Sequence, residues 1–190
     1  RFGFITSTGI NGITPMVGDQ LTRAWFALHT KSRFENVVNE GLTKKTVEVF
    51  LPKITVKSRR RDRHKMIRVP LFPGYLFVRT DLNPYRHVEI LKTTGAVRLI
   101  GNIRGPLPIA DATIDSLKIM VCADGDVITG TRFKKGDRVM VINGPFAGVT
   151  GVFSSYRGEG RVIVNIEALG QFAAVNVDAA DVEKLPEKLS

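Results

Sequence analysis

Leu71-Phe72-Pro73-Gly74-Tyr75-Leu76-Phe77-Val78-Arg79 is the stretch that decides the fold of this chain. From Tyr75 onward the residues are consistently apolar, and successive side chains of a strand point to opposite faces. Both faces of the predicted strand are therefore apolar, and each needs a cover. Pro73 and Gly74 continue a ladder poorly, so they mark the bend into the strand.

Positive charge is concentrated in the first part of the chain. The 190 residues carry a formal net charge of +10. Residues 21–122 hold 19 Lys and Arg against 8 Asp and Glu, whereas residues 123–190 hold 8 against 9. This distribution favours a polyanionic partner, with nucleic acid as the candidate, at the first part of the chain. A solvated basic surface without any partner is the alternative.

The remaining composition indicates a globular cytoplasmic protein. Cys122 is the only cysteine, so no intrachain disulfide can form and nothing indicates an oxidising compartment. The chain contains no apolar run long enough to span a bilayer, and we expect no membrane partner. Residues 1–22 are expected to form a disordered tail, because they are rich in Gly, Thr and Ser. We expect a monomer.

Residues 23–122 are predicted to form the first domain. Residues 24–29 are typical of a central strand. Ser32 and Glu35 have the spacing of a capping box and start a helix that is expected to end near Gly41. Residues 47–52 then predict an edge strand, because the final proline would remove a ladder hydrogen bond from a central one.

The second half of this domain repeats the pattern. Residues 57–68 hold seven Lys or Arg, which is typical of a solvated hairpin tip. After the strand predicted from Tyr75 onward, Asn83 is expected to cap a helix that begins at Pro84. A strand at residues 96–100 and a helix capped by Asp111 follow. The prediction is an α+β domain, in which an antiparallel sheet is backed on one face by helices.

Residues 123–131 are polar and are predicted to be an interdomain linker. Residues 132–190 then show short β-branched runs separated by turns, at residues 138–142, 151–153, 161–166 and 172–177. Strands of this length at regular spacing predict a small SH3-like β-barrel. Because glycines interrupt these runs, we expect no helical form of this domain.

From residue 24 to residue 185 the chain resembles the bacterial NusG transcription elongation factors. The blocks that carry the resemblance are residues 25–30 and 72–78 in the first domain, and residues 133–139, 143–148 and 181–185 in the second. The resemblance implies an NGN domain followed by a KOW domain. It also implies pause suppression, which is a shift between polymerase states without covalent chemistry.

The resemblance implies a polymerase-binding surface on the NGN domain. In the family, this domain lays an apolar patch on the clamp of the largest subunit of RNA polymerase, and a second contact reaches the opposite jaw. Carried over to this sequence, the patch or its support comprises Phe72, Tyr75, Phe77 and Leu99, and the second contact comprises Arg86 and His87. From the residues alone, the alternative is that both faces of the strand are covered internally.

Two groups of cations are candidates for nucleic-acid contacts. Lys31 and Arg33 precede a predicted helix, where related factors approach the non-template DNA strand, and a helix start with two cations suits phosphate. The second group lies in the hairpin tip, where it could contact upstream DNA non-specifically, and comprises Arg59, Arg60, Arg61 and Arg63. Ordinary surface charge is the alternative for both groups.

The KOW domain carries a candidate protein-binding tip at Gly144, Pro145 and Phe146. The resemblance implies that this tip contacts ribosomal protein S10 or the termination factor Rho, and a phenylalanine in a glycine-rich turn is hard to bury. The alternative is a ring that folds back onto the barrel. After Ile166 the sequence departs from the housekeeping pattern, which resembles specialised RfaH-like paralogues; a general elongation factor remains the other reading.

No pattern of residues predicts an enzyme. The three histidines are far apart in sequence, and no spacing typical of a metal site or a dinucleotide loop occurs, so we expect no catalytic residues, no metal and no cofactor. Two other functions stay open. One is a ribosome-associated RNA-binding KOW protein, and the other is a basic DNA-binding protein whose affinity falls steeply with salt.

Overall fold

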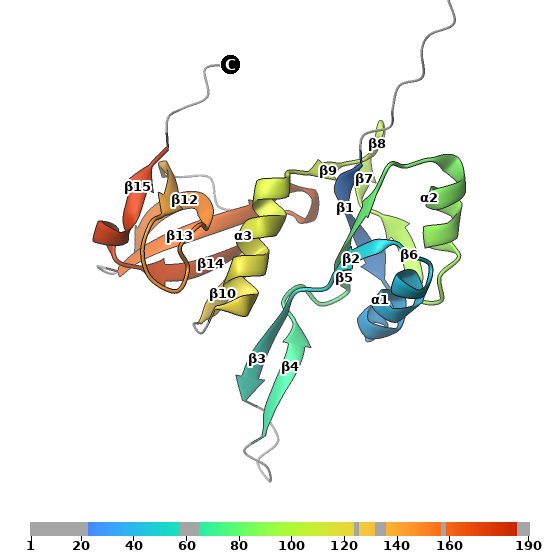
Figure 1. Ribbon diagram of the computed structural model, residues 1–190, viewed down its shortest axis with the longest axis horizontal. Helices are drawn as coiled ribbons and strands as arrows, with labels where there is room; N and C mark the ends of the chain where they lie inside the picture. Colours follow the sequence, from blue (N-terminus) through green and yellow to red (C-terminus); the bar gives the residue numbers. More distant parts are fainter. Residues whose placement is uncertain (1–22, 58–64, 124–125, 132–135, 157–158, 186–190) are drawn as a thin grey trace, which may run out of the picture.

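The computed structural model describes residues 23–57, 65–123, 126–131, 136–156 and 159–185. Two antiparallel β units lie side by side, and helix α3 (Asp111–Cys122) lies between them (Figure 1). Among the described residues, no helix is both long and apolar enough to cross a membrane. The predicted tail at residues 1–22 lies outside the described residues.

Strand β5, the strand predicted from Tyr75 onward, lies inside the N-terminal sheet. The strands follow the order β2-β5-β1-β6, and β9 also pairs with β1. Their bounds are β1 (Ala24–Thr30), β2 (Glu48–Phe50), β5 (Tyr75–Thr80), β6 (Ala96–Leu99) and β9 (Pro108–Ile109). Strand β5 pairs with β1 along its whole length, and β2 lies at the edge. Both placements confirm what the sequence predicted.

Helices cover both faces of this sheet. Helices α1 (Glu35–Lys44) and α2 (Pro84–Leu91) cover the face that carries Phe26, Leu28, Leu76 and Val78. The opposite face carries Trp25, Ala27 and Phe77, and it shares an apolar cluster with Ile114, Leu117 and Met120 of α3. The prediction that helices back only one face was therefore wrong, because the second apolar face is buried against α3.

The three predicted helix starts differ in outcome. The predicted Asp111 cap was wrong, because Ala110 occupies the N-cap of α3 without a side-chain hydrogen bond and Asp111 is the first helical residue. Asn83 caps α2 as predicted, since its side-chain oxygen accepts the Tyr85 N–H at 3.0 Å. The predicted capping box of α1 was wrong: Phe34 occupies the N-cap without a side-chain hydrogen bond. The buried Glu35 carboxylate instead accepts the Gly74 N–H at 2.7 Å, which ties α1 to the bend before β5.

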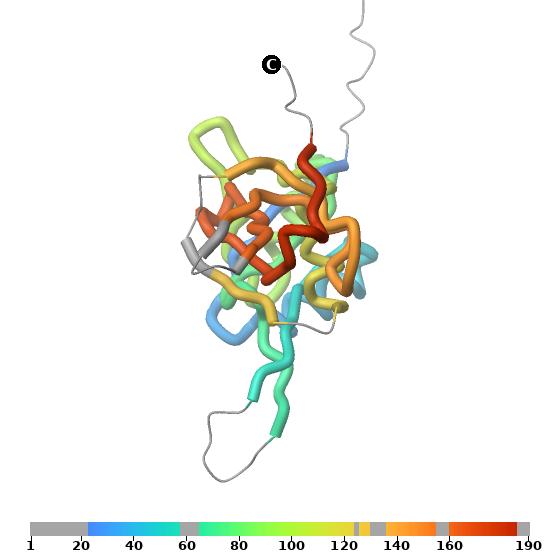
Figure 2. Tube along the Cα trace, turned by 90° about the vertical axis from the view of Figure 1, so that its left-hand side faces the viewer, coloured from blue at the N-terminus to red at the C-terminus, as the bar shows by residue number. Residues whose placement is uncertain are grey.

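Two hairpins project from the N-terminal unit. Strands β3 (Lys53–Lys57) and β4 (Met66–Pro70) pair with each other as a separate ribbon, and the tip at residues 58–64 lies outside the described residues. Strands β7 (Gly101–Asn102) and β8 (Gly105–Pro106) form a much shorter hairpin. Figures 1 and 2 both show the β3–β4 ribbon extending away from the body of the protein.

The C-terminal unit is a six-stranded antiparallel sheet with the order β10-β14-β13-β12-β11-β15. The bounds are β10 (Val127–Thr131), β11 (Arg138–Val141), β12 (Thr150–Tyr156), β13 (Glu159–Ile166), β14 (Gln171–Val177) and β15 (Val182–Lys184). The predicted strands are confirmed. The linker prediction was wrong for residues 127–131, because β10 pairs over its full length with β14. Its β-branched Val127, Ile128 and Thr129 favour a strand.

Candidate functional site

The sheet face predicted to be bare is covered in this structure. Phe77 and Phe72 are completely buried, and their rings meet edge to face with centroids 6.2 Å apart. Phe50 also stacks with Phe77, with the ring centroids 6.1 Å apart. The expectation that the Phe77 face stays open was therefore wrong, because α3 and the C-terminal unit complete an apolar cluster over it, and of the predicted roles of Phe72 and Phe77 only support of the patch is left.

Tyr75 is the member of the predicted patch that solvent can reach. It pairs with His29 across β1 and β5, and the two rings lie 5.2 Å apart. Its side chain is only partly buried at the rim of the cluster that contains Phe77. Tyr75 therefore presents a partly exposed ring at the edge of a buried apolar cluster.

Leu99 does not lie beside Tyr75. Leu99 pairs with Leu28, and both side chains belong to the cluster beneath α1 and α2. That face of the sheet is opposite to the face of Phe77, and Leu99 is buried there. The predicted grouping of Leu99 with the aromatic patch was wrong, because the strand register decides which face each side chain occupies.

Helix α3 covers the Trp25 end of the sheet face that carries Phe77. The Lys118 ammonium lies 5.3 Å from the centre of the Trp25 ring, and the Arg79 guanidinium lies 6.0 Å from it. Arg79 also approaches Asp111 at the start of α3, at 3.8 Å. Cations over an indole ring are attracted to its face, so these contacts fix α3 on the sheet.

A hydrogen bond joins α3 to the C-terminal unit. The Ser116 hydroxyl accepts the Thr150 N–H at 3.0 Å and donates to the Ala112 carbonyl at 2.8 Å. Ser116 is 1% exposed, so the bond lies inside the contact between the two units. No local pattern in the sequence predicts this role, since a serine inside an amphipathic helix is usually at the surface.

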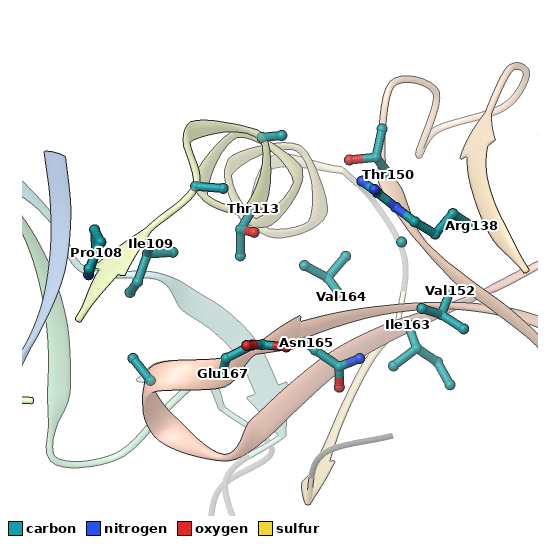
Figure 3. Close-up of a pocket in the computed structure, with 14 residues that line it drawn as sticks. Pro108, Ile109, Thr113, Arg138, Thr150, Val152, Ile163, Val164, Asn165 and Glu167 are labelled. Atoms are coloured by element: carbon teal, nitrogen blue, oxygen red, sulfur yellow. The ribbon is translucent and has the colours of Figure 1, made fainter. Parts of the chain in front are cut away.

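A cavity of about 410 Å³ lies beside this contact (Figure 3). Thr113 and Ile109 face it from α3 and β9, and Val164 and Asn165 face it from β13. Its lining is mixed in polarity. Among the described residues, no group of three or more His, Cys, Asp or Glu side chains is arranged to hold a metal ion.

The predicted protein-binding tip of the C-terminal unit is partly covered. Phe146 is only 6% exposed and belongs to the cluster that includes α3, so the expectation of an exposed ring was wrong. Gly144 and Pro145 are exposed as predicted. A Cβ atom built on Gly148 would lie 3.1 Å from the Ile119 side chain, which places this loop directly against α3.

The predicted polar contacts are spread over the surface. Lys31 and Arg33 are exposed in the turn before α1, where the Glu35 carboxylate stands at the helix start. Binding of a phosphate there would depend on the two cations, since the Glu35 carboxylate already lies at the N-terminus of α1. Arg86 and His87 are half-buried on α2. The cations of the hairpin tip, Arg59, Arg60, Arg61 and Arg63, lie outside the described residues.

Comparison with known proteins finds relatives that match most of this chain. The family model described as "Transcription termination factor nusG" matches residues 23–118. The chain is 29% identical to the transcription termination/antitermination protein NusG of Thermus thermophilus over 184 residues, covering 84% of this chain and 97% of the relative. It is 30% identical to the protein of the same name from Streptococcus pyogenes over 145 residues, covering 70% and 80%.

The fold also matches a solved structure. A structure described as "Domain interaction in Thermotoga maritima NusG" superposes with a TM-score of 0.51 and covers 88% of this chain and 99% of that one. The two sequences are 24% identical, so this likeness concerns the fold.

Proposed function

Because the chain belongs to the NusG family of transcription termination/antitermination proteins, we propose that it binds RNA polymerase through the surface of its N-terminal sheet around Tyr75. Proteins of this family are transcription factors and not enzymes. The proposed activity is suppression of pausing during elongation. The binding partner is the clamp of the largest polymerase subunit.

The observation that carries this proposal is that Tyr75 stays partly exposed at the rim of the apolar cluster that contains Phe77 and Phe72. Phe77 and Phe72 are inaccessible, and the Tyr75 ring packs at the rim of their cluster and against the His29 ring. A tyrosine fixed in this way loses little side-chain freedom on binding, and tyrosines are enriched among the residues that dominate interface energies. Phe72 and Phe77 therefore act in this proposal as support, and Tyr75 makes the contact.

A second polymerase contact is proposed at Arg86 and His87. These residues lie on α2, which covers the face opposite to Phe77. The two proposed contacts therefore lie on opposite sides of one rigid sheet, as a bridge between two jaws requires. Such a bridge favours the closed clamp over the paused state only by the difference in its affinity for the two states.

Nucleic acid is the other proposed partner of the N-terminal unit. Lys31 and Arg33 are exposed and could meet the phosphates of the non-template strand. Contacts of this kind position a protein without reading sequence. The proposal expects this part of the binding to weaken steeply as salt rises.

The C-terminal unit is proposed to bind ribosomal protein S10 or the termination factor Rho through Gly144, Pro145 and Phe146. Phe146 is buried against the α3 cluster, so full use of this tip needs the loop to separate from α3. Release of the Ser116–Thr150 contact would accompany that separation. The proposed connection between the domains ends before β10, because β10 pairs with β14 of the C-terminal sheet.

Transcription across a pause site with purified polymerase tests the proposal. The full chain should shorten the pause, and Tyr75→Ala should abolish most of this effect. Ile103→Ala is the control, because Ile103 is fully exposed in the turn between β7 and β8, outside both proposed polymerase contacts, and should tolerate truncation. Equal activity of the two variants would contradict the proposal.

The same assay addresses specialisation. We propose an operon-specific paralogue, supported by the departure from the family pattern at residues 167–175, which here form a short turn of 3-10 helix and the start of β14. Such a factor should act only on templates that carry its own leader DNA. Equal pause suppression on every template would indicate a general factor.

A further inference from the structure

The β3–β4 ribbon has two chemically different faces. Ile54 lies opposite Val69, and Val56 lies opposite Ile67. Because side chains alternate along a strand, these four residues share one face of the ribbon. The other face carries Lys53, Thr55, Lys57, Met66 and Arg68. The described part of the ribbon contains no Asp or Glu.

The apolar face begins at the proposed polymerase-binding surface. Ile54 packs against the same cluster as Phe50 and Tyr75, all three being partly buried at its rim. Farther out, Val56 is half-buried and Ile67 is 38% exposed. The ribbon extends away from both β units in the two perpendicular views (Figures 1 and 2), so the rim around Tyr75 continues along it.

This surface has the properties of a protein-binding site. A two-stranded ribbon without a covering layer is only marginally stable in water, and a partner on its apolar face would stabilise it. Ile and Val side chains offer no hydrogen-bonding groups to bases or phosphates. A contiguous apolar strip with a cationic border therefore fits an apolar protein surface bordered by acidic residues.

We propose that the apolar face of the β3–β4 ribbon is the outer part of the polymerase-binding surface and makes the first contact with polymerase. The inference rests on the proposed function, and the occupant is the same polymerase partner. The remainder of the Phe77 face is covered by α3 and the C-terminal unit, whereas the ribbon and Tyr75 are accessible. The ribbon therefore engages while that cover is in place.

Binding kinetics of the full chain with core RNA polymerase test this inference. Substitutions at an interface usually change mainly the dissociation rate, whereas a residue of the first contact also changes association, so Ile67→Ser should slow association about tenfold. Ile103→Ser is the matched control, because Ile103 is fully exposed in the turn between β7 and β8, far from the cluster. Val56→Thr, which keeps the size and β-branching of the side chain, should slow association in the same direction if Ile67→Ser folds poorly.

The outcomes separate the two claims. If the unmodified chain fails to bind polymerase, the proposed function and the ribbon contact both fall. If binding occurs and Tyr75→Ala weakens it, but Ile67→Ser and Val56→Thr associate at the normal rate, only the ribbon contact is overturned. Slow association of both ribbon variants with normal Ile103→Ser supports it.

Discussion

Ser116→Ala should open the contact between α3 and the C-terminal unit without unfolding either one. The change removes the acceptor of the Thr150 N–H, which lies 3.0 Å from the Ser116 hydroxyl. An amide left without a partner costs about 1–3 kcal/mol when buried, and Thr150 is half-buried, so we expect about 1.5 kcal/mol. The closed arrangement should therefore become about tenfold less favoured.

Hydrogen–deuterium exchange measures this opening segment by segment. Exchange should accelerate about tenfold at residues 143–152, whose amides become accessible when the loop leaves α3, and stay unchanged in β1 and β5. Thr113→Ala on the same helix is the control, because no hydrogen bond of its hydroxyl to a described residue is seen. Equal acceleration in β1 and β5 would show that Ser116 supports folding as a whole and would refute the reasoning.

Two further substitutions test the packing beneath the proposed surface. Phe77→Ala should lower the free energy of unfolding by about 3–5 kcal/mol, because a fully buried ring leaves a cavity, whereas Tyr85→Ala should change it by less than about 0.5 kcal/mol; chemical denaturation compares the two, and similar losses would contradict the assigned burial. Gly95→Ala should destabilise more than Gly105→Ala, because both glycines have positive φ but only a Cβ on Gly95 would meet the Phe34 ring, at 2.7 Å; equal melting temperatures would contradict this clash.

Local signals in the sequence predicted local structure well. The apolar run after Gly74 predicted β5, and the Asn83 side chain followed by Pro84 predicted the cap of α2. These features depend on residues close in sequence, so alternation and capping chemistry suffice. The predicted capping box at Ser32 was wrong because of a contact that is distant in sequence: the Glu35 carboxylate accepts the Gly74 N–H.

Burial between distant segments could not be predicted. A strand that is apolar on both faces shows that two covers are needed, but it does not say whether the second is a partner or another part of the chain. Here α3 and the C-terminal unit supply it, and the same contact buries Phe146. The face of Leu99 depended on strand register, which no local pattern of that short strand specified.

Photo-crosslinking from position 75 tests the proposed polymerase surface most directly. A photoreactive phenylalanine analogue would replace Tyr75 in one variant and Tyr85 in a control, and each full chain would be irradiated in an elongation complex. A surface centred on Tyr75 predicts crosslinks from position 75 to the clamp of the largest subunit, and none there from position 85. Clamp crosslinks from position 85 alone would contradict it.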